Sequence, residues 1–225
     1  MRNSYIEMLK ALNIEDKYFI NWGIKEIKEL LPEKKLVEKE WKNLKKKIDS
    51  GKDVYIRGYG QDKNISGIQD LYKKAGFLCN IVCDTNNNSS PKKLMNIITN
   101  YRVQKRESNK FTAIQHYKIS HIWGFTKNIY LFNTPWNMIY TPYIIDPFTG
   151  HETYDNNLKH QIKKVISNLI FNEYGCLIKD YNNILENDTR IRKIVEICEC
   201  DKNDKFYIEM KKQWTKLTKN NILQG

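Results

Sequence analysis

Long apolar segments are missing from this 225-residue sequence. No apolar run approaches the roughly 18 residues that a membrane-spanning helix requires. The first twelve residues carry Arg2, Glu7 and Lys10 where a signal peptide would have its apolar core. We therefore expect a cytoplasmic protein that does not enter a membrane.

Cysteine is also scarce, and its spacing is unusual for a metal site. The five cysteines are an odd number, and none stands in the Cys-x-x-Cys pair of a structural zinc knuckle. Reduced, mostly buried thiols are the main prediction. A zinc site that joins Cys79 and Cys83 to Cys198 and Cys200 stays an open alternative.

Acidic residues are few relative to basic ones. The sequence has 38 Lys and Arg against 26 Asp and Glu, which is a formal net charge of +12. Lysines and arginines that neutralise phosphates release condensed counterions, so such a surplus favours a nucleic-acid partner. A general enrichment in Lys, Asn and Ile would give the same surplus, and charge alone leaves both explanations open.

Helical patterns predominate along the chain. Val37, Trp41, Leu44 and Ile48 recur at spacings of four, three and four, which predicts a helix that begins near Pro32 and ends before Gly51. Residues 54–57 are typical of a short strand. Further helices are predicted at residues 66–76, from Pro91 to Arg102, from Leu158 to Gly175, and in the last fifty residues.

The most informative segment is YKISHIWGFTKNIYLFNTPWNMIYTPYIIDPFTGHE, residues 117–152. Its β-prone ends and glycine- and proline-containing middle predict the order strand, loop, strand, turn, helix. His121 lies near the end of the first strand, Asn137 follows the loop, and Asp146 and His151 stand at the entrance to the helix. This order brings the four polar side chains to face one another across a small finger.

These residue types suit the hydrolysis of a phosphodiester bond. A neutral imidazole such as that of His121 can deprotonate water near neutral pH. A divalent cation needs carboxylate or imidazole ligands such as Asp146 and His151. The amide of Asn137 can hold the histidine or the loop in place by hydrogen bonds.

The segment resembles the HNH family of ββα-metal nucleases, in particular small bacterial and phage proteins akin to restriction endonucleases. The elements that carry the resemblance are Ser120-His121-Ile122, then Asn137-Met138-Ile139, then Asp146 nine residues later, then His151. The wider likeness includes VYIRGYGQD and DTNNNSSP and covers roughly residues 54–152. It implies that His121 is the general base, Asn137 a structural asparagine, and Asp146 and His151 the metal ligands.

The sequence departs from this family at two places. Ser120 stands where many HNH enzymes have an Asp or His ligand, and the zinc-knuckle cysteines that brace many HNH fingers are absent from both flanks. Aromatic packing would have to brace the finger instead. Whether Ser120, Glu152 or His160 joins the metal site is left open.

The resemblance implies an α+β fold, mainly helical, with a ββα-metal finger inserted between helical flanks. We expect residues 1–110 to form a helical region with a short strand that contributes to DNA binding. Residues 111–175 would then be the catalytic region and residues 176–225 a C-terminal helical region, all in one compact unit.

The expected function is that of a metal-dependent endonuclease of restriction type, which cuts double-stranded DNA with Mg²⁺ or Mn²⁺. A homodimer and a cognate DNA methyltransferase are expected partners. The alternatives are a monomeric nicking or phage nuclease and a nucleic-acid-binding protein without catalysis. Arg57, Lys127 and Asn128 are candidates for contacts to nucleic acid, although solvated positions explain them as well.

Overall fold

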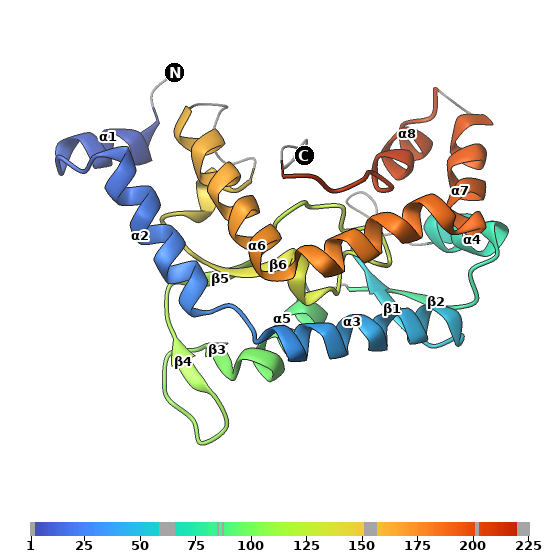
Figure 1. Ribbon diagram of the computed structural model, residues 1–225, viewed down its shortest axis with the longest axis horizontal. Coiled ribbons are helices and arrows are strands. Elements are labelled where there is room, and N and C mark those ends of the chain that lie inside the picture. The colour runs from blue at the N-terminus through green and yellow to red at the C-terminus, as the bar shows by residue number, and fades with distance from the viewer. Residues whose placement is uncertain are drawn as a thin grey trace.

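The computed structural model describes residues 3–58, 66–84, 86, 88–150, 157–200 and 203–219. Within these residues helices predominate and the strands form two-stranded sheets, which confirms the prediction of an α+β, mainly helical fold (Figure 1). The helices are α1 (Ser4–Ala11), α2 (Asp16–Glu29), α3 (Lys34–Asp49), α4 (Ser66–Ala75), α5 (Ser89–Thr99), α6 (Asn157–Asn187), α7 (Thr189–Cys200) and α8 (Lys205–Lys212). The strands are β1 (Asp53–Ile56), β2 (Asn80–Cys83), β3 (Tyr101–Val103), β4 (Thr112–Ile114), β5 (Tyr117–His121) and β6 (Met138–Pro142).

Helix α3 forms where its apolar periodicity predicts it. The four predicted positions Val37, Trp41, Leu44 and Ile48 are its buried residues. They face α6 and β1, while most of the lysines of α3 point to solvent. The indole Nε1 of Trp41 donates to Asp180 Oδ2 at 2.6 Å, which ties α3 to α6.

The strand predicted at residues 54–57 is β1, and it has a parallel partner, β2, that the sequence patterns did not predict. Val54 pairs with Ile81, and Ile56 pairs with Cys83. Helix α4 connects the two strands in sequence. The carboxyl ends of a parallel pair lie at the same edge, so Arg57 and Asp84, which follow the two strands, come close together.

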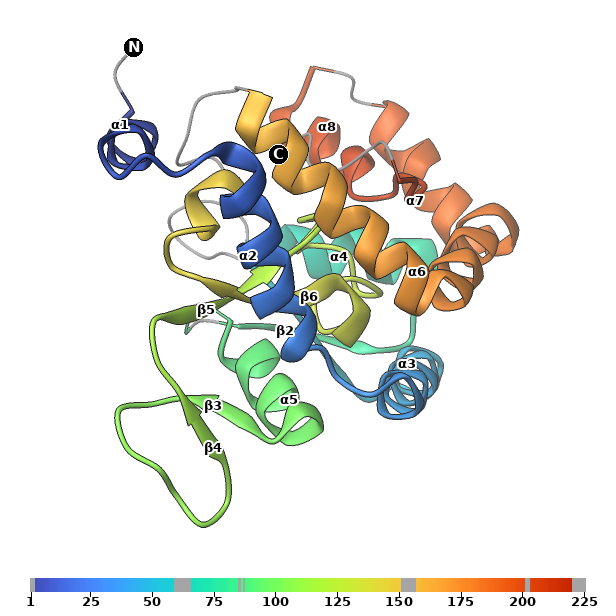
Figure 2. The same ribbon diagram turned by 60° about the vertical axis from the view of Figure 1, so that its left-hand side comes forward.

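The predicted strands of the finger pair as an antiparallel hairpin. Tyr117 of β5 lies opposite Pro142 of β6, and His121 lies opposite Met138. The connection between them, residues 122–137, ends in a short 3₁₀ helix, η1 (Pro135–Asn137), and β6 begins directly after it at Met138. Helix α2 packs on β6, and α6 contacts η1 and a second 3₁₀ helix, η2 (Asp146–Phe148) (Figure 2).

Two predicted helix ends are wrong. Helix α5 ends at Thr99 and not at Arg102, because Asn100 takes a left-handed conformation (φ 62°) and β3 begins directly after it. Helix α6 does not end at Gly175 but continues to Asn187 with non-helical angles at Tyr174. The hydroxyl of Tyr174 donates to the carbonyl of Pro32 at 2.6 Å, so a tertiary contact anchors the kink.

Strands β3 and β4 form a short parallel pair whose connecting loop projects from the body of the molecule (Figure 2). The body itself has a continuous apolar core that includes Ile27, Trp136 and Ile194, one from each of the three predicted regions. A smaller cluster joins α5 to the hairpin through Met95, Ile119 and other residues. Among the described helices, none is both long enough and apolar enough to cross a membrane.

Candidate active site

His121 is the last residue of β5, and its ring is held by one neighbour, Phe132. His121 Nε2 lies 2.7 Å from the carbonyl oxygen of Phe132, and the two rings stack with centroids 5.3 Å apart and 12° between their planes. A carbonyl oxygen can only accept a hydrogen bond, so we assign the proton of the neutral imidazole to Nε2. Nδ1 then keeps its lone pair and is the nitrogen that can accept a proton.

The environment of His121 keeps its ring uncharged. Burial lowers the pKa of His121 to about 4, and the positive charge of Arg57 acts in the same direction. The hydrogen bond to Phe132 and the negative charge of Asp84 oppose this shift but do not cancel it. At neutral pH the imidazole is therefore in the proton-accepting form that a general base requires.

Asn137 ties together the two ends of the connection between β5 and β6. Its side chain is fully buried, and Oδ1 accepts the backbone N–H of Trp123 at 3.1 Å. Nδ2 donates to the carbonyl oxygens of Leu131 at 3.0 Å and Gly124 at 3.4 Å. Because these carbonyls and the N–H belong to the loop that presents Phe132 to His121, Asn137 is a structural residue that shapes the site.

Asp146 is a buried carboxylate whose hydrogen-bond partners come from β5 and from its own turn. Its side chain is 7% exposed, and Lys118 pairs with Oδ2. The hydroxyl of Ser120 donates to Oδ1 at 2.7 Å, and Thr149 Oγ1 lies 3.5 Å from the same oxygen. A carboxylate removed from water needs such partners to offset the cost of its burial.

His121 and Asp146 line the same cleft, which has a volume of about 670 Å³. Arg57 enters it from the end of β1, and Lys92 enters it from α5. Lys118, Lys127 and Glu209 complete the charged lining. The charged residues that line this cleft therefore come from parts of the chain that lie up to about 150 residues apart.

Comparison with known proteins places the chain in a sequence family. The family model described as "Uncharacterised protein PM1201" matches residues 32–224. The chain belongs to this family. A relative from Pasteurella multocida (strain Pm70), described as "Uncharacterized protein PM1201", is 36% identical over 187 residues, which is 82% of this chain and 80% of the relative. No solved structure matches the chain.

All the candidate site residues lie within the region that the family model matches. Helices α1 and α2 lie before residue 32 and therefore outside it. Helix α2 nevertheless contacts elements that carry the site. It packs on β6, and its Gly23 faces the side chain of Ile145, the residue before Asp146.

The structure describes one of the two metal ligands that the resemblance implies. Asp146 is a suitable oxygen ligand, but His151 and Glu152 lie outside the residues that the structure describes. Within the described ranges no group of three or more His, Cys, Asp and Glu side chains is arranged to hold a metal ion. His160 is exposed near the start of α6, and Ser120 directs its hydroxyl at Asp146.

Two of the three predicted nucleic-acid contacts have structural roles. Asn128 is fully buried, and its Nδ2 donates to Tyr181 Oη at 3.0 Å and to the carbonyl of Gln213 at 2.8 Å. It cannot reach a ligand, so the prediction for Asn128 is wrong. Lys127 lines the cleft but is nearly buried and paired with Glu209 of α8. Arg57 lines the cleft without such a pair among the described residues.

Sequence reasoning missed Lys92, Lys118 and Asp84. Lys118 stands two residues before Ser120, so the alternation of a strand puts both on one face, and this signal was available. Asp84 accepts hydrogen bonds from Ser89 Oγ at 2.9 Å and from the backbone N–H of Ser90 at 2.7 Å. Its position between an apolar strand and a Ser-Ser-Pro helix start is typical of a helix N-terminal acceptor.

The cysteines do not assemble into a site. All five are free thiols; Cys79 and Cys198 are buried, while Cys176 and Cys200 are exposed. Burial raises the pKa of Cys79 and of Cys198 to about 11, so neither is a reactive thiolate at neutral pH.

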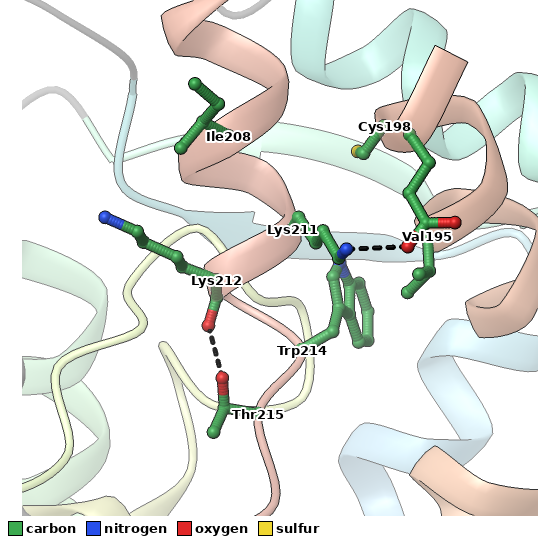
Figure 3. Close-up of a pocket in the computed structure, with 8 residues that line it drawn as sticks. Val195, Cys198, Ile208, Lys211, Lys212, Trp214 and Thr215 are labelled. Atoms are coloured by element: carbon green, nitrogen blue, oxygen red, sulfur yellow. Dashed lines mark hydrogen bonds and ion pairs between the residues drawn. The ribbon is translucent and has the colours of Figure 1, made fainter. Parts of the chain in front are cut away.

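A second hollow, of about 550 Å³, lies between α7 and α8 (Figure 3). Val195, Cys198, Ile208 and Trp214 give it an apolar lining. Its carboxylate, Glu199, is paired with Lys211 at 2.6 Å. The hollow therefore offers apolar contact but no arrangement of groups for proton transfer.

Proposed function

We propose that the cleft around His121 and Asp146 is the active site of a metal-dependent DNA endonuclease of the HNH type. The proposed substrate is double-stranded DNA, cut as a restriction endonuclease cuts it. The observation that carries the proposal is that His121, at the end of a hairpin strand, and Asp146, after the hairpin, line one cleft while Asn137 holds the connection between the strands.

The order of elements supports this proposal. An antiparallel hairpin, β5 and β6, is followed by a long helix, α6, which contacts η1 and η2. Lys163 and Ile166 of α6 line a small cavity together with Ser120 and His121. The helix therefore backs the strand that carries the proposed base, as the HNH resemblance implies.

The geometry supports a separate role for each residue in the proposed reaction. His121 Nδ1 takes a proton from a water molecule, and the resulting hydroxide forms a bond to phosphorus. The bond from phosphorus to the 3′ oxygen breaks, which leaves a 5′-phosphate and a 3′-hydroxyl after the leaving oxygen gains a proton. Asn137 acts indirectly, because it holds the loop whose Phe132 carbonyl orients the imidazole.

Asp146, with His151 as the second ligand that the resemblance implies, would hold a divalent cation. Mg²⁺ or Mn²⁺ would supply neutralisation of charge on the scissile phosphate and the leaving oxygen. Asp146 suits this role because its carboxylate lines the cleft beside His121. The ammonium of Lys118 pairs with Oδ2, so a divalent cation would have to displace it from that oxygen. The net charge of +12 supports a polyanionic substrate.

The test is incubation of purified protein with supercoiled plasmid and Mg²⁺ or Mn²⁺, beside His121→Ala and His116→Ala. His116 is the matched control, because it is an exposed histidine that does not line the cleft. We expect fragments of defined length with the wild type and His116→Ala, and intact plasmid with His121→Ala. Circular dichroism checks that both variants fold.

Other outcomes separate the alternatives. Nicked circles without linear fragments would indicate a monomeric nicking nuclease, and sedimentation of the protein would then give a monomer rather than the homodimer expected of a restriction enzyme. Binding to DNA without cleavage would indicate a non-catalytic nucleic-acid-binding protein. Equal cleavage by the wild type and His121→Ala would contradict the assignment of the base.

A further inference from the structure

The charges that line the cleft do not balance. Four cations, Arg57, Lys92, Lys118 and Lys127, face two carboxylates there. Lys118 pairs with Asp146, and Lys127 pairs with Glu209. Neither Arg57 nor Lys92 forms an ion pair with any carboxylate in the described part of the chain, so the excess positive charge of the cleft is concentrated on these two side chains.

Arg57 is held firmly and has a donor to spare. Its backbone N–H donates to the carbonyl of Thr126 at 2.9 Å, which ties the end of β1 to the β5–β6 connection. Its Nη2 donates to Asn88 Oδ1 at 2.5 Å. Its Nε is buried and has no hydrogen-bond partner among the described residues. An unsatisfied buried donor is costly. Nη1 also has no hydrogen-bond partner among the described residues, but it is not buried, so it is the donor that a ligand oxygen in the cleft would reach.

Asp84 lies close to Arg57 but does not neutralise it by direct contact. Its Oδ1 accepts from Ser89 Oγ and from the backbone N–H of Asn86, and its Oδ2 accepts from the backbone N–H of Ser90. Burial lowers the pKa of Arg57, and the charge of Asp84 opposes that shift. An arginine stays protonated at neutral pH, so its guanidinium remains available to an anion.

We propose that Arg57 and Lys92 form a subsite for one phosphate group of a nucleic-acid strand, adjacent to His121 in the same cleft. The planar guanidinium offers parallel N–H donors that match two oxygens of a phosphate, and the lysine adds a second positive charge. This inference rests on the proposed function and assigns the group that receives the scissile phosphate. Arg57 would then be a catalytic residue, because it touches the reacting phosphate.

The subsite also couples binding to the base. Arg57 is one of the charges that keep the imidazole of His121 unprotonated. A bound phosphate offsets that positive charge, so His121 becomes a stronger proton acceptor once the strand is in place. Substrate binding and activation of the base would thus use the same arginine.

The test uses the full-length protein and nuclear magnetic resonance of the His121 ring. Inorganic phosphate and a short DNA duplex are titrated separately into the wild type, Arg57→Gln, Lys92→Gln and Lys93→Gln. Lys93 is the matched control, because it is an exposed neighbour of Lys92 that does not line the cleft. We expect both ligands to shift the His121 signals and to raise its pKa in the wild type and in Lys93→Gln.

In Arg57→Gln the affinity for both ligands should fall roughly 10- to 100-fold, as expected for a hydrogen-bonded charge. Lys92→Gln should reduce it roughly 2- to 5-fold. Even without ligand, Arg57→Gln should raise the pKa of His121, a change that a purely structural role would not produce. If Arg57→Gln does not fold, the affinity of Lys92→Gln for the two ligands tests the subsite. The Lys92 side chain is exposed, so this substitution should leave the fold intact.

The outcomes separate this inference from the proposed function. If Arg57→Gln binds phosphate and duplex as the wild type does, the subsite is wrong, even if plasmid cleavage still depends on His121. If ligand binding depends on Arg57 but the wild type never cuts DNA, the subsite stands and the nuclease proposal fails. Loss of phosphate binding with unchanged duplex binding would overturn the assignment to a nucleic-acid strand.

Discussion

The imidazole of His121 and the backbone carbonyl of Phe132 form a 2.7 Å hydrogen bond, and the two rings lie almost parallel against each other. Phe132 therefore orients the imidazole through its carbonyl oxygen and covers one face of the imidazole with its own ring. The contact decides which nitrogen carries the proton, and the burial that accompanies it keeps the ring neutral. The chemistry proposed for the cleft depends on this pair.

The first prediction concerns stability against pH. The folded pKa of His121 is about 4, and the unfolded value is about 6.5. Between these values the unfolded chain binds a proton that the folded chain does not, so this residue lowers the free energy of unfolding as pH falls from 6.5 to 4. Its contribution to the slope is at most about 1.4 kcal/mol per pH unit.

Urea denaturation of the wild type and His121→Gln at several pH values measures this slope. The difference in stability between the two proteins should change between pH 4 and 6.5 and stay constant above and below. A titration midpoint of the His121 ring near 6.5, observed by nuclear magnetic resonance without ligand, would show that the ring is solvated and that the assignment of its environment is wrong.

The second prediction concerns Asn137. Asn137→Ala removes its three side-chain hydrogen bonds and leaves the N–H of Trp123 and the carbonyl of Leu131 without their partner. We expect a loss of about 2–4 kcal/mol in the free energy of unfolding, measured by urea denaturation. Asn187→Ala is the control, because Asn187 is exposed, and it should change stability by no more than about 0.5 kcal/mol. Equal effects of the two variants would contradict the structural role of Asn137.

The third prediction concerns Asp146. Asp146→Asn keeps the shape of the side chain and an acceptor for Ser120 but removes the negative charge. We expect Mn²⁺ affinity, followed by electron paramagnetic resonance, to fall at least roughly 10-fold, and cleavage to fall with it. Glu209→Gln is the control, because Glu209 is the other carboxylate of the cleft and is paired with Lys127. Unchanged Mn²⁺ binding by Asp146→Asn would show that Asp146 is not a metal ligand.

The fourth prediction concerns Gly23, the glycine of α2 that lies against the turn before Asp146. An added Cβ would stand 2.4 Å from Ile145 Cδ1 and 2.7 Å from Ile145 Cγ1, and Ile145 is buried. Gly23→Ala should therefore destabilise the protein by about 1–3 kcal/mol, although alanine favours a helix. It should also slow cleavage, because Ile145 must move and Asp146 follows it in the chain.

Gly175→Ala is the matched control for that substitution. Gly175 also lies in a helix, and a Cβ there meets nothing within 4 Å. Gly175→Ala should raise the free energy of unfolding by roughly 0.5–1 kcal/mol, measured by thermal denaturation. If Gly23→Ala stabilises the protein as much as Gly175→Ala does, that result would contradict the close contact between α2 and the side chain of Ile145.

Local patterns in the sequence determined a large part of the fold. The spacing of Val37, Trp41, Leu44 and Ile48 placed α3 and its buried face, because a helix repeats every 3.6 residues whatever surrounds it. The alternation and β-propensity near His121 placed β5 in the same way. Strand β2 escaped prediction, because it is four residues long and is stabilised by pairing with β1, which a local pattern does not record.

For the candidate site, the sequence by itself determined the kinds of residue and their order: His121, then Asn137, then Asp146. Only the tertiary structure decided which charges are already paired. Lys127 meets Glu209 from a position 82 residues away, and Arg57 meets Asn88 from 31 residues away. Such contacts depend on how helices and strands pack and not on the periodicity of either segment. That is why a lysine expected to contact DNA proved to be engaged, while the charge of Arg57 remains available in the cleft.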